Sequence, residues 1–145
     1  MARVRSARFE RLDTRTLYAL LRLRVDVFVV EQNCPYPEVD GRDVEPETVH
    51  VWAEADDRIV AYLRVLTEPD GRRIGRVCTA EAARGRGLAG QLMSEALRHV
   101  GDTPAWLHAQ TPAIGLYRRH GFAAQGPEFL VDGIPHVLMR REASG

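Results

Sequence analysis

The sequence predicts an α+β fold with a mixed central sheet of about six to seven strands and flanking helices. Runs with strand-like composition and runs with helical spacing of apolar residues follow one another along the chain. In addition, two tight turns join three successive strand-like runs into an antiparallel meander. The chain has 145 residues and no linker-like tract, so we expect residues 1–145 to form a single domain.

The first elements are a short strand, an amphipathic helix and a polar loop. The strand is expected over Val4–Phe9. Asp13 can cap the helix, whose apolar residues recur at helical spacing at Leu17, Leu20, Leu21, Val25 and Phe28. The helix should end near Asn33. Residues 34–46 combine prolines with carboxylates, which indicates an ordered loop with little regular backbone hydrogen bonding.

The meander comes next, over His50–Ala55, Arg58–Leu66 and Arg73–Thr79. Its turns are Asp56-Asp57 and the stretch 69–71, and such short connections join antiparallel neighbours.

The remaining elements follow from apolar periodicity and from helix start and stop residues. They are a helix over Leu88–Val100 ended by Gly101, a strand over Ala105–Gln110, a helix from its N-cap Thr111 to His120 ended by Gly121, and a hairpin over 122–141 that turns at Asp132-Gly133.

Composition excludes several classes of protein. The 20 basic residues, all arginine, balance 20 acidic ones, so we expect no nucleic-acid partner. No apolar run approaches a membrane span and the N-terminal stretch lacks the apolar core of a secretory signal, so we expect no membrane association and a cytoplasmic location. Cys34 and Cys78 fit neither a disulfide framework nor a metal-ligand pattern, so no metal is expected.

A glycine-rich stretch precedes the Leu88–Val100 helix. Residues 85–90 read GRGLAG and match the dinucleotide pattern G-x-G-x-x-G. However, this stretch follows the last strand of a meander, and residues 103–110 lack the carboxylate that would hold a ribose. What remains is a helix N-terminus with glycines and two arginines, which favours a bound anion over a mere turn with solvated side chains.

Two motifs carry a resemblance to a known family. Arg84–Ala89 (RGRGLA) is similar to the pyrophosphate loop R/Q-x-x-G-x-G/A of the GCN5-related N-acetyltransferases (GNAT), and Leu116–Phe122 (LYRRHGF) resembles their signature L-Y-x-x-x-G-F. The segments FVVEQNCPY (28–36), VDGRD (39–43) and DGIPH (132–136) resemble the ElaA-type branch of that family.

The resemblance implies a GNAT fold whose strands splay at an acetyl-CoA site, and direct transfer to a primary amine of a small molecule or peptide. It implies no metal and allows a homodimer. Backbone amides of the glycine-rich stretch would bind pyrophosphate, and the strand Arg76–Thr79 would pair with the pantetheine arm. The cofactor-binding residues it implies are Val77, Cys78, Thr79, Arg84, Gly85, Arg86, Gly87, Leu88, Ala89 and Gly90. Cys78 is expected only to pack.

The same resemblance implies catalytic roles. Tyr117 would donate a proton to the departing thiolate. A base could be any of several residues, with Glu31 the first choice, or catalysis could depend on alignment alone. The other candidate bases are Asp40, Asp43, His50, Glu81, His108 and His136.

The acceptor side is expected to use Arg24, Asp40, Asp43 and His136. Carboxylates of the loop 34–46 would form an acidic lining that steers a cationic amine.

Two alternatives remain. Acyl-homoserine lactone synthases resemble the chain through Arg24, Phe28, Asp40, Asp43, Arg64 and Arg76, but the acid they place three residues before the last arginine is Arg73 here. A CoA-binding module without catalysis is the other.

Overall fold

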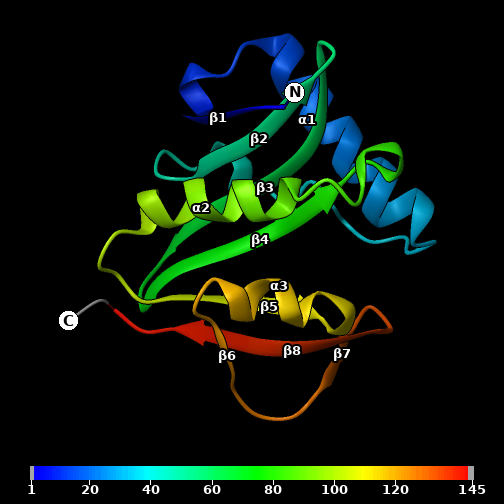
Figure 1. The fold of residues 1–145 in the computed structure, drawn as a ribbon. Coiled ribbons are helices and arrows are strands. Elements are labelled where there is room, and N and C mark those ends of the chain that lie inside the picture. Colours follow the sequence, from blue (N-terminus) through cyan, green and yellow to red (C-terminus); the bar gives the residue numbers. More distant parts are fainter. Residues whose placement is uncertain (1, 144–145) are drawn as a thin grey trace.

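The computed structural model describes residues 2–143 and contains one mixed sheet with helices on both faces (Figure 1). Its eight strands run in the order β1-β2-β3-β4-β5-β8-β6, and β7 pairs with β8. The strands are β1 (Arg3–Arg8), β2 (Val49–Ala55), β3 (Arg58–Glu68), β4 (Gly71–Thr79), β5 (Ala105–Gln110), β6 (Ala123–Ala124), β7 (Phe129–Val131) and β8 (Ile134–Arg141). The α+β prediction is confirmed. The sheet has eight strands and not the predicted six to seven, because the count includes the two very short strands β6 and β7.

Three α-helices and several single turns complete the chain. They are α1 (Thr14–Arg24), α2 (Leu88–Val100), α3 (Ile114–Arg119), the π-helix η2 (Val25–Glu31) and the 3₁₀ turns η1 (Phe9–Arg11), η3 (Arg42–Val44), η4 (Glu81–Ala83) and η5 (Thr111–Ala113). The carboxylate of Asp13 accepts the Thr16 N–H at 2.7 Å, which confirms the predicted N-cap. In residues 2–143, no helix has the length and apolar character needed to cross a membrane.

The helix after β5 begins later than the sequence predicts. Thr111 does not cap it with its side chain; instead its carbonyl oxygen accepts the N–H of Ile114 in the 3₁₀ turn η5. The α-helical part therefore starts only at Ile114.

The sheet separates two apolar cores. Leu92 and Met93 of α2 and Tyr117 of α3 pack on one face with β-strand side chains. Leu20 and Leu23 of α1 pack on the other face. The helices thus hold the sheet from both sides.

Strands β4 and β5 pair only at their beginnings. The parallel ladder joins Arg72 to Ala105 and Arg73 to Trp106, and from there the two strands diverge (Figure 1). A bulge marks the same part of β4, where Arg76 has φ +54° and the register with β3 shifts. Within residues 2–143, the edge of β4 that faces β5 therefore has no strand beside it after Arg73.

The junction of the two strands is tightly packed. A Cβ on Gly71, which has φ +144°, would lie 2.3 Å from the carbonyl oxygen of Pro104. That oxygen accepts the Arg72 N–H at 2.9 Å. Gly71 is thus required for the close approach that starts the split.

Candidate active site

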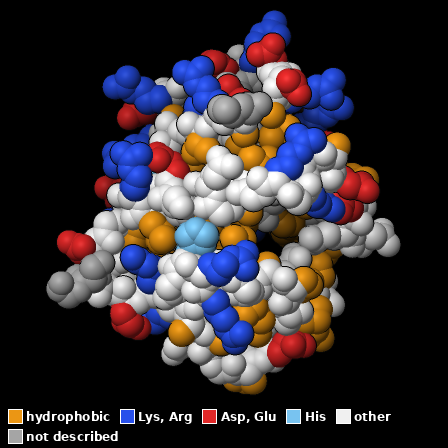
Figure 2. All heavy atoms as spheres, in the orientation of Figure 1, with side chains coloured by type: hydrophobic (Ala, Val, Ile, Leu, Met, Phe, Trp, Pro, Cys, Tyr) orange, Lys and Arg blue, Asp and Glu red, His pale blue; other side chains and the backbone are white. Residues whose placement is uncertain are grey.

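A cavity of about 190 Å³ opens where β4 and β5 separate. Its walls come from η2, the loop after it, β4, β5, α3 and the β7–β8 hairpin. Figure 2 shows the face that α2 and α3 cover, where a hollow lies between the two helices and charges of both signs are interspersed around it. The split sheet thus brings segments from most of the chain to one site.

The glycine-rich stretch lies between β4 and α2. Gly87 is the N-cap of α2 with φ +74°, and Gly85 has φ +81°. These left-handed conformations favour glycine. A Cβ on either glycine would meet nothing within 4 Å, so there is open space in front of the loop. The first N–H groups of α2 face outward without helical partners, which makes this end of α2 suitable for an anion.

The arginines of this stretch differ in their surroundings. The guanidinium of Arg84 donates two hydrogen bonds of 2.6 Å to the carboxylate of Glu31, and its Nε donates to the Thr79 carbonyl at 3.1 Å. Arg86 is exposed, and its guanidinium donates to the Ala82 carbonyl at 3.4 Å.

Glu31 is therefore poorly suited to the role of base. Its hydrogen bonds with Arg84 hold the pKa of the Glu31 carboxyl below its usual value, so it accepts a proton less readily. It acts in the structure as a tie between η2 and the glycine-rich stretch.

Tyr117 lies at the floor of the cavity. Its side chain is buried, packs edge-on against Phe122 with ring centres 6.4 Å apart, and lines the cavity. Burial raises the pKa of the Tyr117 phenol, so the hydroxyl stays protonated at neutral pH. In residues 2–143 no side-chain hydrogen bond occupies this hydroxyl, and it is free to donate to a ligand.

Cys78 points away from the cavity. It packs with Leu20, Leu23 and Tyr62 beneath α1, which confirms the packing role. Burial raises the pKa of its thiol well above the usual value, so it is a poor nucleophile.

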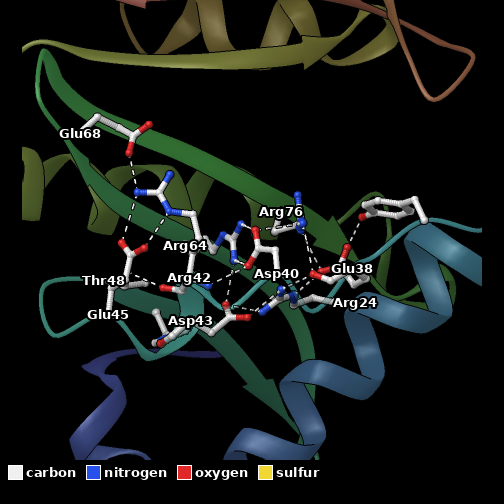
Figure 3. A network of polar contacts seen from close by, with 12 residues as sticks. Arg24, Glu38, Asp40, Arg42, Asp43, Glu45, Thr48, Arg64, Glu68 and Arg76 are labelled. Atoms are coloured by element: carbon white, nitrogen blue, oxygen red, sulfur yellow. Dashed lines mark hydrogen bonds and ion pairs between the residues drawn. The ribbon is translucent and has the colours of Figure 1, made fainter.

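Arg24 and Asp43 form an internal ion-pair network with neighbouring charges (Figure 3). Arg24 is fully buried and donates to Asp43 at 2.7 Å and to Glu38 at 2.6 Å. Asp43 also accepts a hydrogen bond from Arg64 at 3.0 Å. Both side chains are buried and neither lines the cavity, so the part of Arg24 and Asp43 in binding the acceptor stays a prediction.

The same network occupies the remaining loop carboxylates. Asp40 pairs with Arg64 and Arg76, and Glu38 pairs with Arg76 at 2.9 Å. Glu45 pairs with Arg42. None of these carboxylates lines the cavity, and the exposed Asp40 is paired with arginines, so the acidic lining that would steer a cationic amine stays a prediction. The arginines that neutralise these carboxylates come from α1, η3, β3 and β4.

Histidines lie on the cavity wall formed by β5 and β8. Gln110 is paired with His136 across the two strands, and His108 projects from the same face. The Nδ1–H of His136 donates to the Ile134 carbonyl at 2.7 Å, which leaves Nε2 as an acceptor. Burial and the charges of Arg73 and His136 lower the pKa of His108.

The other two candidate bases lie elsewhere. His50 is fully buried, accepts from the Tyr62 hydroxyl at 2.6 Å and donates to the Asp43 carbonyl at 3.0 Å. Glu81 lies in η4, outside the cavity lining.

Sequence reasoning missed Arg73 as a site residue. Arg73 is among the residues that line the cavity, and its guanidinium stacks over Trp106, with 5.0 Å between Cζ and the ring centre. Alternation along β5 places Trp106, His108 and Gln110 on one face, so the sequence indicates this wall of the cavity, but it does not indicate that Arg73 of β4 lies beside it. Across residues 2–143, no group of His, Cys, Asp and Glu is arranged to hold a metal ion.

Comparison with known proteins agrees with the arrangement of the strands and the loop. The acetyltransferase (GNAT) domain family matches residues 24–143. A UPF0039 protein of Mycobacterium tuberculosis is 52% identical over 139 residues, covering 92% of this chain and 89% of the relative.

Solved structures show the same fold over nearly the whole chain. An acyl-CoA N-acyltransferase from Pseudomonas aeruginosa superposes with a TM-score of 0.91 at 44% identity, covering 97% of this chain and 99% of the other. ElaA from Escherichia coli gives a TM-score of 0.91 at 39% identity and coverages of 98% and 100%. The acyl-homoserine lactone synthase BjaI shares the fold, with a TM-score of 0.75 at 20% identity and coverages of 99% and 83%. The chain belongs to the GNAT acetyltransferase family, in its ElaA-type branch, and has the acyltransferase fold of that family.

Proposed function

We propose that this protein transfers an acetyl group from acetyl-CoA directly to a primary amine. The observation that carries the proposal is the edge of β4 beyond Arg73, which has no strand beside it within residues 2–143 and is followed, after η4, by the glycine-rich stretch at the start of α2. An extended arm can pair with such an edge, and a pyrophosphate suits the helix N-terminus. The open space in front of Gly85 and Gly87 fits a phosphate group against the backbone.

In this proposal each part of the site has one task. Backbone amides from Gly87 to Gly90 hold the pyrophosphate, and Arg86 adds a positive charge. Bound acetyl-CoA supplies an activated thioester carbonyl. The Tyr117 hydroxyl, protonated because of its burial, donates a hydrogen bond to the sulfur as negative charge develops there.

His136 is the residue we propose as the proton acceptor for the amine, in place of Glu31. The Nδ1–H of His136 donates to the Ile134 carbonyl, which leaves the lone pair of Nε2 free to accept a proton. The His136 side chain lines the cavity, where the amine would bind. Glu31, by contrast, is occupied by Arg84.

A lactone synthase is not proposed. The residues shared in order with those synthases include Arg24, Asp43 and Arg64, and in this chain they bind one another inside the protein. They support the fold of the acceptor side and carry no information about the product.

Thermal unfolding with different ligands tests the cofactor. CoA at about 100 times its dissociation constant should add about 2.7 kcal/mol to the free energy of unfolding, and NAD and ATP should not. Gly87→Glu should abolish the CoA effect by placing a negative charge before the helix N-terminus. Gly126→Glu is the matched control, because Gly126 also has positive φ and open space around it. An equal shift with NAD would contradict the CoA assignment.

Turnover tests the chemistry. Tyr117→Phe keeps the ring and should lower kcat by roughly 100-fold with little change in CoA binding. Tyr18→Phe, at an exposed tyrosine of α1, is the control. Stabilisation by CoA without acetylation of any amine would identify a CoA-binding module in place of an enzyme.

A further inference from the structure

We propose that the amine acceptor also carries a carboxylate, and that Arg73 binds this carboxylate. The proposal rests on the N-acyltransferase function proposed above and reverses the cationic acceptor that the sequence predicts. The argument begins with the charges that line the cavity.

Two arginines line the cavity, and their surroundings differ. Arg76 is paired with Glu38 at 2.9 Å and lies 3.4 Å from Asp40, so its charge is compensated. Arg73 has no hydrogen bond or ion pair to a carboxylate within residues 2–143. Arg73 is therefore the arginine of the cavity that remains available to a ligand.

The position of Arg73 is fixed by its neighbours. It lies on β4 at the last rung shared with β5, where its partner is Trp106. The guanidinium stacks over the Trp106 ring, and the indole N–H donates to Asp70 at 3.3 Å. An arginine held on an aromatic ring loses less freedom when it binds a ligand than a free surface arginine does.

The lining of the cavity itself carries little negative charge. Asp132 is the carboxylate among the cavity-lining residues, and it lies exposed in the β7–β8 turn. Burial lowers the pKa of Arg73, the charge of Glu68 raises it, and the charges of other arginines lower it, so Arg73 carries its positive charge in a partly desolvated wall. An acceptor with a second amine would be repelled from this wall, whereas a carboxylate can form two parallel hydrogen bonds with a guanidinium.

Calorimetry on the full chain saturated with CoA provides the test. The ligands are glycine, β-alanine and γ-aminobutyrate, each compared with its primary amide and with the diamine of matching length. At least one amino acid should bind about 10- to 100-fold more tightly than its amide and its diamine, the range expected for hydrogen bonds to a charged group.

Variants then assign the preference to a residue. Arg73→Gln should remove it, and Arg73→Lys should restore part of it. Arg72→Gln is the matched control, because Arg72 is the adjacent residue of β4 and lines a separate groove beside Ser6 and His99. Circular dichroism establishes that each variant is folded.

The outcomes separate the two proposals. Amides or diamines that bind as tightly as the amino acids, or a preference that survives in Arg73→Gln, would overturn the role of Arg73; acetylation of those amines would leave the transferase function standing. Amino acids that bind through Arg73 without accepting an acetyl group would support the carboxylate site and contradict the proposed transfer.

Discussion

Replacing Asp43 with asparagine should destabilise the protein and leave acceptor selection unchanged. The Asp43 carboxylate accepts hydrogen bonds from Arg24 at 2.7 and 3.2 Å and from Arg64 at 3.0 Å. Asparagine keeps the shape and one acceptor oxygen but removes the charge that separates two buried guanidinium groups. Breaking a buried ion pair costs about 3–5 kcal/mol. Because one acceptor remains, we expect about 3 kcal/mol, or a fall in Tm of about 6–12 °C.

Urea unfolding followed by circular dichroism measures this loss. Asp26→Asn is the control, because Asp26 is exposed and lies 4.0 Å from Arg22 in a surface pair that contributes about 0–1 kcal/mol. Although burial opposes it, hydrogen bonding and charge from Arg24 and Arg64 lower the pKa of Asp43. The Asp43 carboxylate stabilises the protein above about pH 4, and this contribution is lost as the pH falls further. The free energies of unfolding of Asp43→Asn and of the Asp26→Asn control should therefore converge in acid.

Two results would refute this reasoning. One is equal stability of Asp43→Asn and Asp26→Asn at neutral pH. The other is a raised KM for the amine acceptor without a loss of stability, which would place Asp43 against the substrate.

Three further predictions address the split, the buried histidine and Glu31. Gly71→Ala should cost about 1–3 kcal/mol in unfolding experiments, since its Cβ would lie 2.3 Å from the Pro104 oxygen; unchanged stability would show that the junction is loose. Burial lowers the pKa of His50, so stability should decline as the pH falls below about 6.5, and His50→Gln should flatten this decline in unfolding curves; an equally steep decline in the variant would contradict it. Glu31→Gln should leave the pH profile of kcat unchanged, because Arg84 already binds Glu31; loss of the acidic limb, where the rate rises with pH, would restore Glu31 as the base.

Much of the fold follows from local sequence signals. The apolar face of residues 88–100 and the glycine after them predict α2 with the bounds that it has, and the alternation of 105–110 predicts β5. The turn at Asp132-Gly133 is also confirmed, because both residues have positive φ. In these segments, neighbours along the chain determine the conformation.

The acceptor side could not be predicted in the same way, because its contacts are distant in sequence. In the sequence, Glu38 is a single carboxylate in a polar loop. Its partners Arg24 and Arg76 are 14 and 38 residues away and contact it only in the folded protein. Sequence spacing shows the carboxylates and does not show their partners. For the same reason Arg73 gives no signal until β4, β5 and the hairpin enclose a cavity.

Amide hydrogen exchange with and without CoA tests most directly the claim that the cofactor lies along the free edge of β4 and against the start of α2. CoA should slow exchange in peptides covering residues 74–90 and leave β1 and β2 unchanged, and Gly87→Glu should abolish the protection while Gly126→Glu keeps it. Protection confined to other segments, or none in 74–90 at saturating CoA, would contradict the account.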